Sequence, residues 1–175
     1  MRIIAGRWRG HTIQAPPGRH TRPTTDRVRE AWMSALLPEL PGACVLDLFA
    51  GSGALGIEAL SRGAADATFV ERSSGALRAL RANLARLDAI AVATVVRDDA
   101  LRWVARLEAG AFDIALADPP YGAGEAEALV EQWLRRPFAG SLWVEHRSGL
   151  ALPDRARERT RRYGDTTLTT YRAEP

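Results

Sequence analysis

The chain contains no lysine, and it has little cysteine or histidine. All 24 of its basic residues are arginines, and it has one cysteine, Cys44, and three histidines. A single cysteine excludes an internal disulfide, and so few cysteines and histidines argue against a metal site. No apolar run approaches the ~18 residues that a membrane-spanning helix needs, and no apolar segment follows the basic N-terminus as in a secretory signal. We therefore expect a cytoplasmic protein without a membrane anchor or a bound metal.

The composition is typical of a globular domain. The chain has 175 residues, of which 46% are hydrophobic and 26% charged. A chain of about 150 residues buries roughly 70% of its unfolded surface, which is enough for one full core. The segments 2–5 and 11–15 can pair as a small hairpin, and the spacing of Val28, Trp32 and Leu36 predicts a helix that buries them. We predict one structural domain, with an N-terminal extension over 1–37 and a core over 38–175, and we expect a monomer.

Charge is distributed unevenly along the chain. Residues 1–37 carry a net charge of +5, residues 38–146 a net charge of −5, and residues 147–175 a net charge of +3. Arginine-rich ends around an acidic middle are typical of a protein that binds nucleic acid beside a cofactor site. Solvated surface charge would give the same counts, so the distribution alone does not decide between the two interpretations.

From residue 43 onward, short β-rich runs alternate with helical stretches. Repeated strand–helix–strand units indicate a mostly parallel sheet with helices on both faces. Only Tyr163-Gly164-Asp165 separates the last two strands, and so short a connection makes an antiparallel hairpin. The predicted fold class is α/β, a Rossmann-like sheet of seven strands with the hairpin and helix of the extension added. The predicted strands are 44–49, 67–71, 91–96, 112–118, 140–146, 157–163 and 165–171, with helices to about 62 and over 73–88, 101–107 and 124–136.

The segment DLFAGSGALG, from Asp47 to Gly56, follows the first strand and opens a helix. Gly51, Gly53 and Gly56 have the G-x-G-x-x-G spacing, which permits a tight turn and a close approach of the backbone to a nucleotide. Glu71 ends the next strand, where a carboxylate can accept hydrogen bonds from ribose hydroxyls. The pattern suits NAD, FAD or S-adenosyl-L-methionine. Asp47 favours S-adenosyl-L-methionine, because a carboxylate suits an ammonium group and repels a pyrophosphate.

The segment Asp118-Pro119-Pro120-Tyr121 follows the fourth strand, at the edge of the sheet where open α/β folds bind ligands. The prolines remove two N–H donors and leave carbonyl oxygens as acceptors. The exocyclic amine of a nucleobase is a poor nucleophile until two acceptors hold its hydrogens, and Tyr121 can stack on a base taken out of its helix. The segment therefore predicts methylation of a base amine. A Pro-Pro turn with a half-buried tyrosine is the structural alternative, and the glycine loop makes it the weaker one.

The sequence resembles the RsmD family, whose members methylate the N2 amine of guanine 966 in 16S ribosomal RNA. The resemblance runs nearly end to end, through RIIAGRWRG, TRPTTDRVREA, DLFAGSGALGIEALSRGA, ADPPY and RRYGDTTLTTY. The glycine loop and DPPY are shared with many amino-methyltransferases, whereas the two N-terminal segments are more particular to this family. The resemblance implies S-adenosyl-L-methionine as the cofactor and 16S rRNA, or the small ribosomal subunit, as the partner.

The resemblance also implies roles for single residues. Asp118, Pro119, Pro120 and Tyr121 would form the catalytic group that holds the guanine. The doubled acid at Asp98-Asp99 leaves open which carboxyl group meets the adenine ring of the cofactor. The cofactor would lie against Asp47, Gly51, Ser52, Gly53, Glu71, Arg72, Asp99, Ala100 and Asp118. The basic N-terminus, apart from the resemblance, predicts RNA contacts from Arg2, Arg7, Trp8, Arg9, Arg19 and Arg22, with the Trp8 ring, between two arginines, stacked on a base.

We therefore predict an S-adenosyl-L-methionine-dependent guanine-N2 methyltransferase of ribosomal RNA. A DNA adenine-N6 or cytosine-N4 amino-methyltransferase is one alternative, but 175 residues leave no room for a separate target-recognition domain. A non-catalytic RNA-binding module that keeps the pocket is another, and the intact Asp118 and Tyr121 argue against it. A nicotinamide oxidoreductase is a more distant third.

Overall fold

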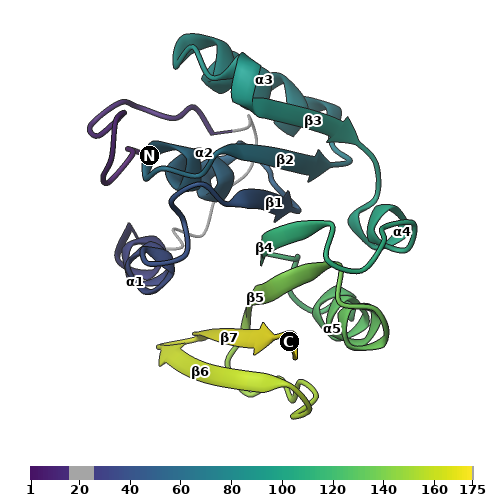
Figure 1. Ribbon diagram of the computed structural model, residues 1–175. Helices are drawn as coiled ribbons and strands as arrows, with labels where there is room; N and C mark the ends of the chain where they lie inside the picture. The colour runs from purple at the N-terminus through teal and green to yellow at the C-terminus, as the bar shows by residue number, and fades with distance from the viewer. Residues whose placement is uncertain (16–25, 175) are drawn as a thin grey trace.

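The computed structural model describes residues 1–15 and 26–174, with one sheet between two layers of helices (Figure 1). The seven strands lie in the order β3-β2-β1-β4-β5-β7-β6. The first five of these run parallel, β7 runs antiparallel to β5, and β6 pairs antiparallel with β7 at the edge. The predicted α/β class, with its seven strands and C-terminal hairpin, is confirmed. The strands are β1 Cys44–Leu48, β2 Asp66–Glu71, β3 Ala93–Arg97, β4 Phe112–Ala117, β5 Ala139–Arg147, β6 Arg157–Tyr163 and β7 Thr166–Arg172.

The helices cover the two faces of the sheet in separate groups. Successive strand residues point to opposite faces, so Val45 packs into one apolar cluster and Leu46 into the other. Side chains of α1, α2 and α3 belong to the first cluster, and side chains of α4 and α5 belong to the second. The helices are α1 Asp26–Leu36, α2 Ala54–Ser61, α3 Ser74–Arg86, α4 Ala100–Val104 and α5 Glu125–Arg135.

The strand order reverses direction between β1 and β4. From β1 the chain proceeds outward through β2 and β3, whereas β4 returns to the other side of β1 and continues to β5. In open parallel sheets, ligands bind outside the carboxyl ends of the strands at such a reversal. The topology therefore puts the glycine loop after β1 next to the DPPY segment after β4.

The N-terminal segment pairs with itself less than the sequence predicts. One isolated antiparallel bridge joins Arg2 to Thr12. The cause lies in α2, where Glu58 is fully buried. Its carboxylate accepts hydrogen bonds from the backbone amides of Ile4 and Ala5, at 2.9 and 3.0 Å. A buried carboxylate needs such donors, so Ile4 and Ala5 dock on α2. The neighbouring Ile3 keeps the short hairpin, since its amide donates to the His11 carbonyl at 3.0 Å and its carbonyl accepts from the Gly10 amide at 2.9 Å.

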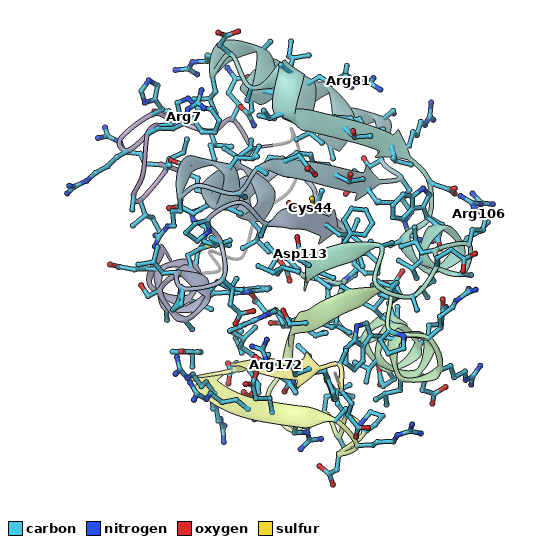
Figure 2. All side chains as sticks on the ribbon, viewed as in Figure 1. Arg7, Cys44, Arg81, Arg106, Asp113 and Arg172 are labelled. Atoms are coloured by element: carbon cyan, nitrogen blue, oxygen red, sulfur yellow. The ribbon has the colours of Figure 1, made fainter. Side chains whose placement is uncertain are left out.

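Cys44, labelled in Figure 2, is the first residue of β1 and therefore lies at the opposite end of this strand from the glycine loop. Its thiol donates to Asp66 Oδ2 at 3.2 Å, and this hydrogen bond is the main reason why the pKa of the thiol is raised. In the part of the chain that the structure describes, no helix has the length and apolar character to cross a membrane. The same residues include no group of three histidine, cysteine or acidic side chains that could hold a metal ion.

Candidate active site

The turn between β1 and α2 forms the first half of the site. Gly53 adopts φ +83°, and a Cβ on it would lie 2.4 Å from Leu80 Cδ1, so this glycine is required for packing. Gly51 also has a positive φ, but a Cβ on it would meet nothing closer than the Phe49 carbonyl oxygen at 4.0 Å. The backbone at Gly51 is therefore the open part of the loop, where a ligand can approach.

Asp47 is buried beneath this loop. Its Oδ2 accepts a hydrogen bond from the Gly56 amide at 2.8 Å, and the side chain is 1% exposed. Burial raises the pKa of Asp47 well above its usual value, and the nearby Asp118 and Glu71 carboxylates raise it further, against the lowering effect of the Gly56 amide. In this structure Asp47 orders the start of α2 through the Gly56 amide.

Glu71 connects the end of β2 to the glycine loop. Its Oε2 accepts a hydrogen bond from the Gly51 amide at 2.9 Å, and its Oε1 accepts one from the Ser73 amide at 2.7 Å. The residue is 7% exposed. Two backbone donors fix the carboxylate beside Gly51, the glycine of this loop whose side is open, so a ligand at Gly51 would lie against Glu71.

The structure separates the two acids that follow β3. Asp98 pairs with Arg102 and Arg106, both at 2.6 Å, and these arginines lower the pKa of Asp98 to about 2. Asp99 instead begins α4, where its Oδ1 accepts the Arg102 amide at 3.1 Å, and its Oδ2 lies 3.4 Å from Arg72. Asp98 is thus held by surface ion pairs, whereas Asp99 turns toward Arg72 at the end of β2.

The DPPY segment leaves β4 beside the end of β5. Ala117 pairs in register with Val144, so Asp118 and Glu145 follow that pair on neighbouring strands. The Tyr121 hydroxyl donates to Glu145 Oε1 at 3.3 Å and lies 3.1 Å from Thr166 Oγ1. Burial raises the pKa of Tyr121 to about 12, and the Glu145 and Asp118 carboxylates contribute to the increase. The phenol therefore stays protonated at neutral pH and remains a donor.

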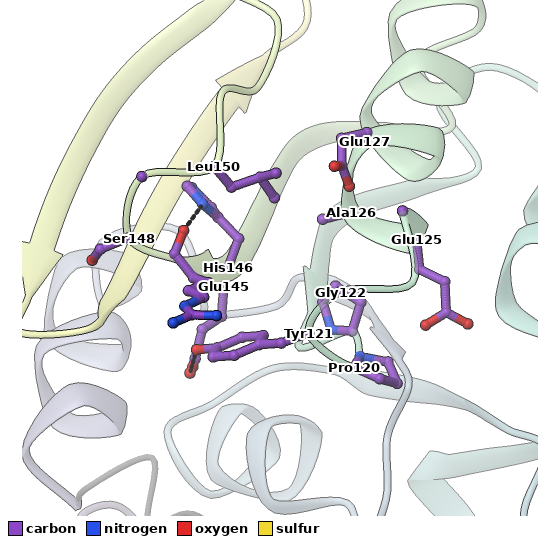
Figure 3. Close-up of a pocket in the computed structure, with 14 residues that line it drawn as sticks. Pro120, Tyr121, Gly122, Glu125, Ala126, Glu127, Glu145, His146, Ser148 and Leu150 are labelled. Atoms are coloured by element: carbon purple, nitrogen blue, oxygen red, sulfur yellow. Dashed lines mark hydrogen bonds between the residues drawn. The ribbon is translucent and has the colours of Figure 1, made fainter.

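A pocket of about 460 Å³ opens between the DPPY segment, the start of α5 and the chain after β5 (Figure 3). Figure 3 shows the Tyr121 ring lying across this pocket with its hydroxyl toward Glu145. The volume is within the range of small-molecule sites. Its lining residues are Pro119, Pro120, Tyr121, Gly122, Gly124, Glu125, Ala126, Glu127, Glu145, His146, Arg147, Ser148, Gly149 and Leu150.

Four carboxyl groups lie in a row along the carboxyl ends of β2, β1, β4 and β5. Alternation along each strand directs all four to the face that carries the first apolar cluster, because Phe69, Val45, Leu116 and Trp143, each two residues earlier, belong to that cluster. We call this row the acidic edge, and it consists of Glu71, Asp47, Asp118 and Glu145. A cationic ligand beside it would be stabilised by the combined negative potential.

The predicted RNA-binding residues are not all accessible. Arg2, Arg7 and Arg9 are exposed, whereas Arg19 and Arg22 lie outside the described residues. Trp8 is only 6% exposed and packs in the core, with the Arg7 guanidinium 4.2 Å from its ring centroid. The prediction that the Trp8 ring stacks on RNA is therefore wrong for this structure, since its faces are covered by protein.

Several residues that build the site were not predicted from the sequence. Asn83 Nδ2 donates to the Ser52 carbonyl in the glycine loop and to the Gln14 carbonyl, both at 3.0 Å. Glu145 lies inside β5, directly after the apolar run from Leu142 to Val144, and that break in the pattern is the one sequence signal that could have identified it. Asn83 stands in an ordinary helical repeat and gave no such signal.

Comparisons with known proteins place the chain among methyltransferase relatives. The family model described as conserved hypothetical protein 95 matches residues 1–172. The chain is 38% identical to a putative rRNA methyltransferase of Bacillus subtilis over 98% of both chains. It is 44% identical to ribosomal RNA small subunit methyltransferase D of Escherichia coli, over 74% of this chain and 65% of that protein.

Solved structures show the same relationship. A putative methyltransferase of Escherichia coli has a TM-score of 0.86 at 36% identity, and the match covers 99% of this chain and 98% of that one. An RNA methyltransferase of Salinibacter ruber, solved with S-adenosyl-L-homocysteine, shares the fold, with a TM-score of 0.68 at 12% identity over 86% of this chain and 92% of that one. The family model and the relatives together show that the chain belongs to the RsmD family of ribosomal RNA methyltransferases.

Proposed function

We propose that this chain transfers a methyl group from S-adenosyl-L-methionine to the N2 amine of a guanine in small-subunit ribosomal RNA, guanine 966 of 16S rRNA by its family resemblance. The position of Asp118 is the observation that carries the proposal. Asp118 follows β4, close enough to Asp47 under the glycine loop to raise its pKa, and the pocket begins at the next residue, Pro119. An acceptor at this point can face a cofactor on one side and a base on the other.

The glycine loop, Glu71 and Asp47 form the part of the site that we call the cofactor half. These residues fit a nucleoside with a positively charged sulfur. The open side of Gly51 leaves room for the ligand, and Glu71 lies against Gly51, where its oxygens can accept ribose hydroxyls. Since Asp98 is held by two arginines, we assign Asp99, with Ala100, to the adenine ring. Bound S-adenosyl-L-methionine supplies an electrophilic methyl group on a sulfonium, whose charge suits the acidic edge.

The DPPY segment and Glu145 form the part of the site that we call the target half. These residues can activate an amine. We assign the two amine hydrogens to the Asp118 carboxylate and the Pro119 carbonyl oxygen, which together localise the nitrogen lone pair. The Tyr121 ring, whose hydroxyl is held by Glu145 and Thr166, would stack on the base. All of these groups act through position and charge, which are the main sources of rate enhancement when the cofactor supplies the chemistry.

Arginines offer a path for the RNA backbone beside this half of the site. On β6, Tyr163 pairs in register with Thr166, and Arg161 pairs with Leu168. Residues paired in register share a face of the sheet, so Arg161 lies on the same face as Thr166, which contacts Tyr121. We propose that rRNA phosphates bind along this face and, at the other end of the molecule, near the exposed Arg7 and its neighbours. This substrate implies that the protein acts in the cytoplasm.

The test is to map transferred methyl groups. The protein is incubated with tritium-labelled S-adenosyl-L-methionine and either 16S rRNA or small ribosomal subunits, and the RNA fragments are analysed by mass spectrometry. We expect one guanine methylated at N2, and a rate of labelling about 10²–10³-fold lower with Asp118→Ala. Methyl transfer to adenine or cytosine amines of DNA instead, or no transfer to either RNA substrate, would overturn the proposal.

A further inference from the structure

Glu145 occupies a position from which it can touch the target base. It follows the register pair of Ala117 and Val144, as Asp118 does, so the two carboxyl groups extend from neighbouring strands about 5 Å apart. Both are on the face of the first apolar cluster. Glu145 also lines the pocket that begins at Pro119. If Asp118 holds the amine of a base, Glu145 therefore lies beside the ring atom next to that amine.

The Tyr121 hydroxyl contributes to holding the Glu145 carboxylate in place. Oε1 accepts the Tyr121 hydroxyl at 3.3 Å, and that hydroxyl is in turn 3.1 Å from Thr166 Oγ1. The side chain is 2% exposed, so bulk water solvates it poorly. An ionised carboxylate only accepts hydrogen bonds, so a ligand atom that lies against Glu145 is favoured when it carries a hydrogen to donate.

Guanine and 2-aminopurine carry the same N2 amine but differ at N1, the ring nitrogen beside it. In guanine the N2 amine is adjacent to N1–H, so its edge presents donors at both positions. In 2-aminopurine the same amine is adjacent to an N1 that carries a lone pair and no hydrogen. A carboxylate accepts a hydrogen bond from the N1–H of guanine and repels the N1 lone pair of 2-aminopurine. A site built to make a hydrogen bond discriminates strongly against an analogue that cannot form that bond.

We propose that Glu145 accepts the N1–H of the target guanine, so that the pocket recognises guanine through N1 and N2 together and excludes bases with an acceptor at N1. The proposal deepens the function proposed above and rests on it. It assigns Glu145 to specificity, whereas Asp118 and Pro119 act on the amine itself. Tyr121 then has two tasks, stacking on the base and holding the carboxylate that identifies it.

The experiment uses small-subunit RNA in which the methylated guanine, once mapped, is replaced by 2-aminopurine. We expect the unmutated protein to prefer guanine by at least ~100-fold in kcat/KM, because the carboxylate cannot donate to the lone pair on N1. In Glu145→Gln the amide can donate to N1, so transfer to 2-aminopurine should rise and the preference should fall at least ~10-fold. A gain of activity on 2-aminopurine cannot result from loss of folding.

Two controls separate this role from simple positioning of Tyr121. Tyr121→Phe removes the hydroxyl but leaves the carboxylate, so the preference for guanine should remain while the rate falls. Glu131→Gln makes the same change on α5, where the side chain is 57% exposed, and should leave the preference at its unmutated value. Equal use of both bases by the unmutated protein, or an unchanged preference in Glu145→Gln, would overturn this inference alone. Absence of guanine methylation by the unmutated protein would overturn the proposed function and this inference with it.

Discussion

The two halves of the acidic edge are held in different ways. On the cofactor half, Glu71 and Asp47 accept hydrogen bonds from backbone amides, including those of Gly51 and Gly56 at 2.9 and 2.8 Å. On the target half, the Glu145 carboxylate accepts from the Tyr121 hydroxyl, at a longer 3.3 Å. Backbone donors are fixed by the fold, whereas a side-chain hydroxyl can rotate to another partner.

This difference corresponds to the two ligands that we propose. A cofactor of constant shape can be met by a loop whose donors are already in place, and such preorganisation reduces the free-energy cost of binding. A base attached to a large RNA must enter a pocket and be turned into position, which side chains that reorient can accommodate. Variants of the two halves should therefore have separable effects, and the predictions below test that separation.

The largest expected effect is that of Asp118→Ala, at the junction of the two halves. The lost acceptor interacts most strongly as positive charge develops on the amine, so kcat should fall about 10²–10³-fold. Binding of S-adenosyl-L-methionine, measured by calorimetry, should stay near its unmutated strength. Asp118→Asn keeps one acceptor oxygen and should recover part of the rate. If Asp118→Ala methylates guanine at the unmutated rate, the DPPY segment is only a structural turn.

The next effect in size is that of Glu71→Ala on the cofactor half. Hydrogen bonds to a charged group contribute about 1.5–3 kcal/mol each, so the dissociation constant for S-adenosyl-L-methionine should rise tenfold or more. RNA affinity, measured without cofactor, should not change. Glu131→Ala on the exposed side of α5 serves as the matched control. Unchanged cofactor affinity in Glu71→Ala would mean that the ribose is held elsewhere.

Much of the fold could be predicted because each element has a local signature. Apolar runs bounded by glycine and proline predicted β1 and β4 to within a residue. The start of β3 was misplaced, because residues 90–92 form a 3-10 turn and the strand begins at Ala93. Helix α4 ends at Val104 instead of extending to residue 107. These errors fall at the ends of elements, where local sequence preferences are weakest.

The site was less accessible to sequence reasoning, because its parts meet across long stretches of chain. The glycine loop and DPPY have recognisable spacing, but the residues that hold them are distant in the sequence. Asn83 lies 31 residues from its partner Ser52 in the loop, and Glu145 lies 24 residues from Tyr121. Trp8 was mistaken for a surface ring, because its flanking arginines suggested exposure. Its burial depends on docking against α2, through the hydrogen bond from the Trp8 amide to Ser61 Oγ at 3.1 Å, and no local pattern predicts such a contact.

On the target half, Tyr121→Ala should have a smaller effect than either carboxylate variant. Base stacking on an aromatic ring contributes about 1–3 kcal/mol. The loss should appear in RNA affinity as well as in the rate, whereas cofactor binding should be unaffected. Tyr121→Phe keeps the ring and should retain most of the RNA affinity. Equal RNA affinity of Tyr121→Ala and the unmutated protein would show that the ring does not contact the base.

The smallest expected effect is that of a single arginine on β6. If about five arginines meet phosphates, the logarithm of RNA affinity should fall against the logarithm of salt concentration with a slope of roughly −3.5 to −4.5. Arg161→Ala should make this slope shallower by about 0.7–0.9 and weaken binding several-fold at low salt. Arg135→Ala on α5, where the arginine side chain is 77% exposed and pairs with Glu131, should change neither quantity.

Cofactor affinity should vary little over the same salt range. The carboxylates of the cofactor half are held by backbone hydrogen bonds, and binding of the cofactor releases no condensed counterions. RNA binding that does not depend on salt would reduce the arginines to surface charge and remove this distinction between the halves.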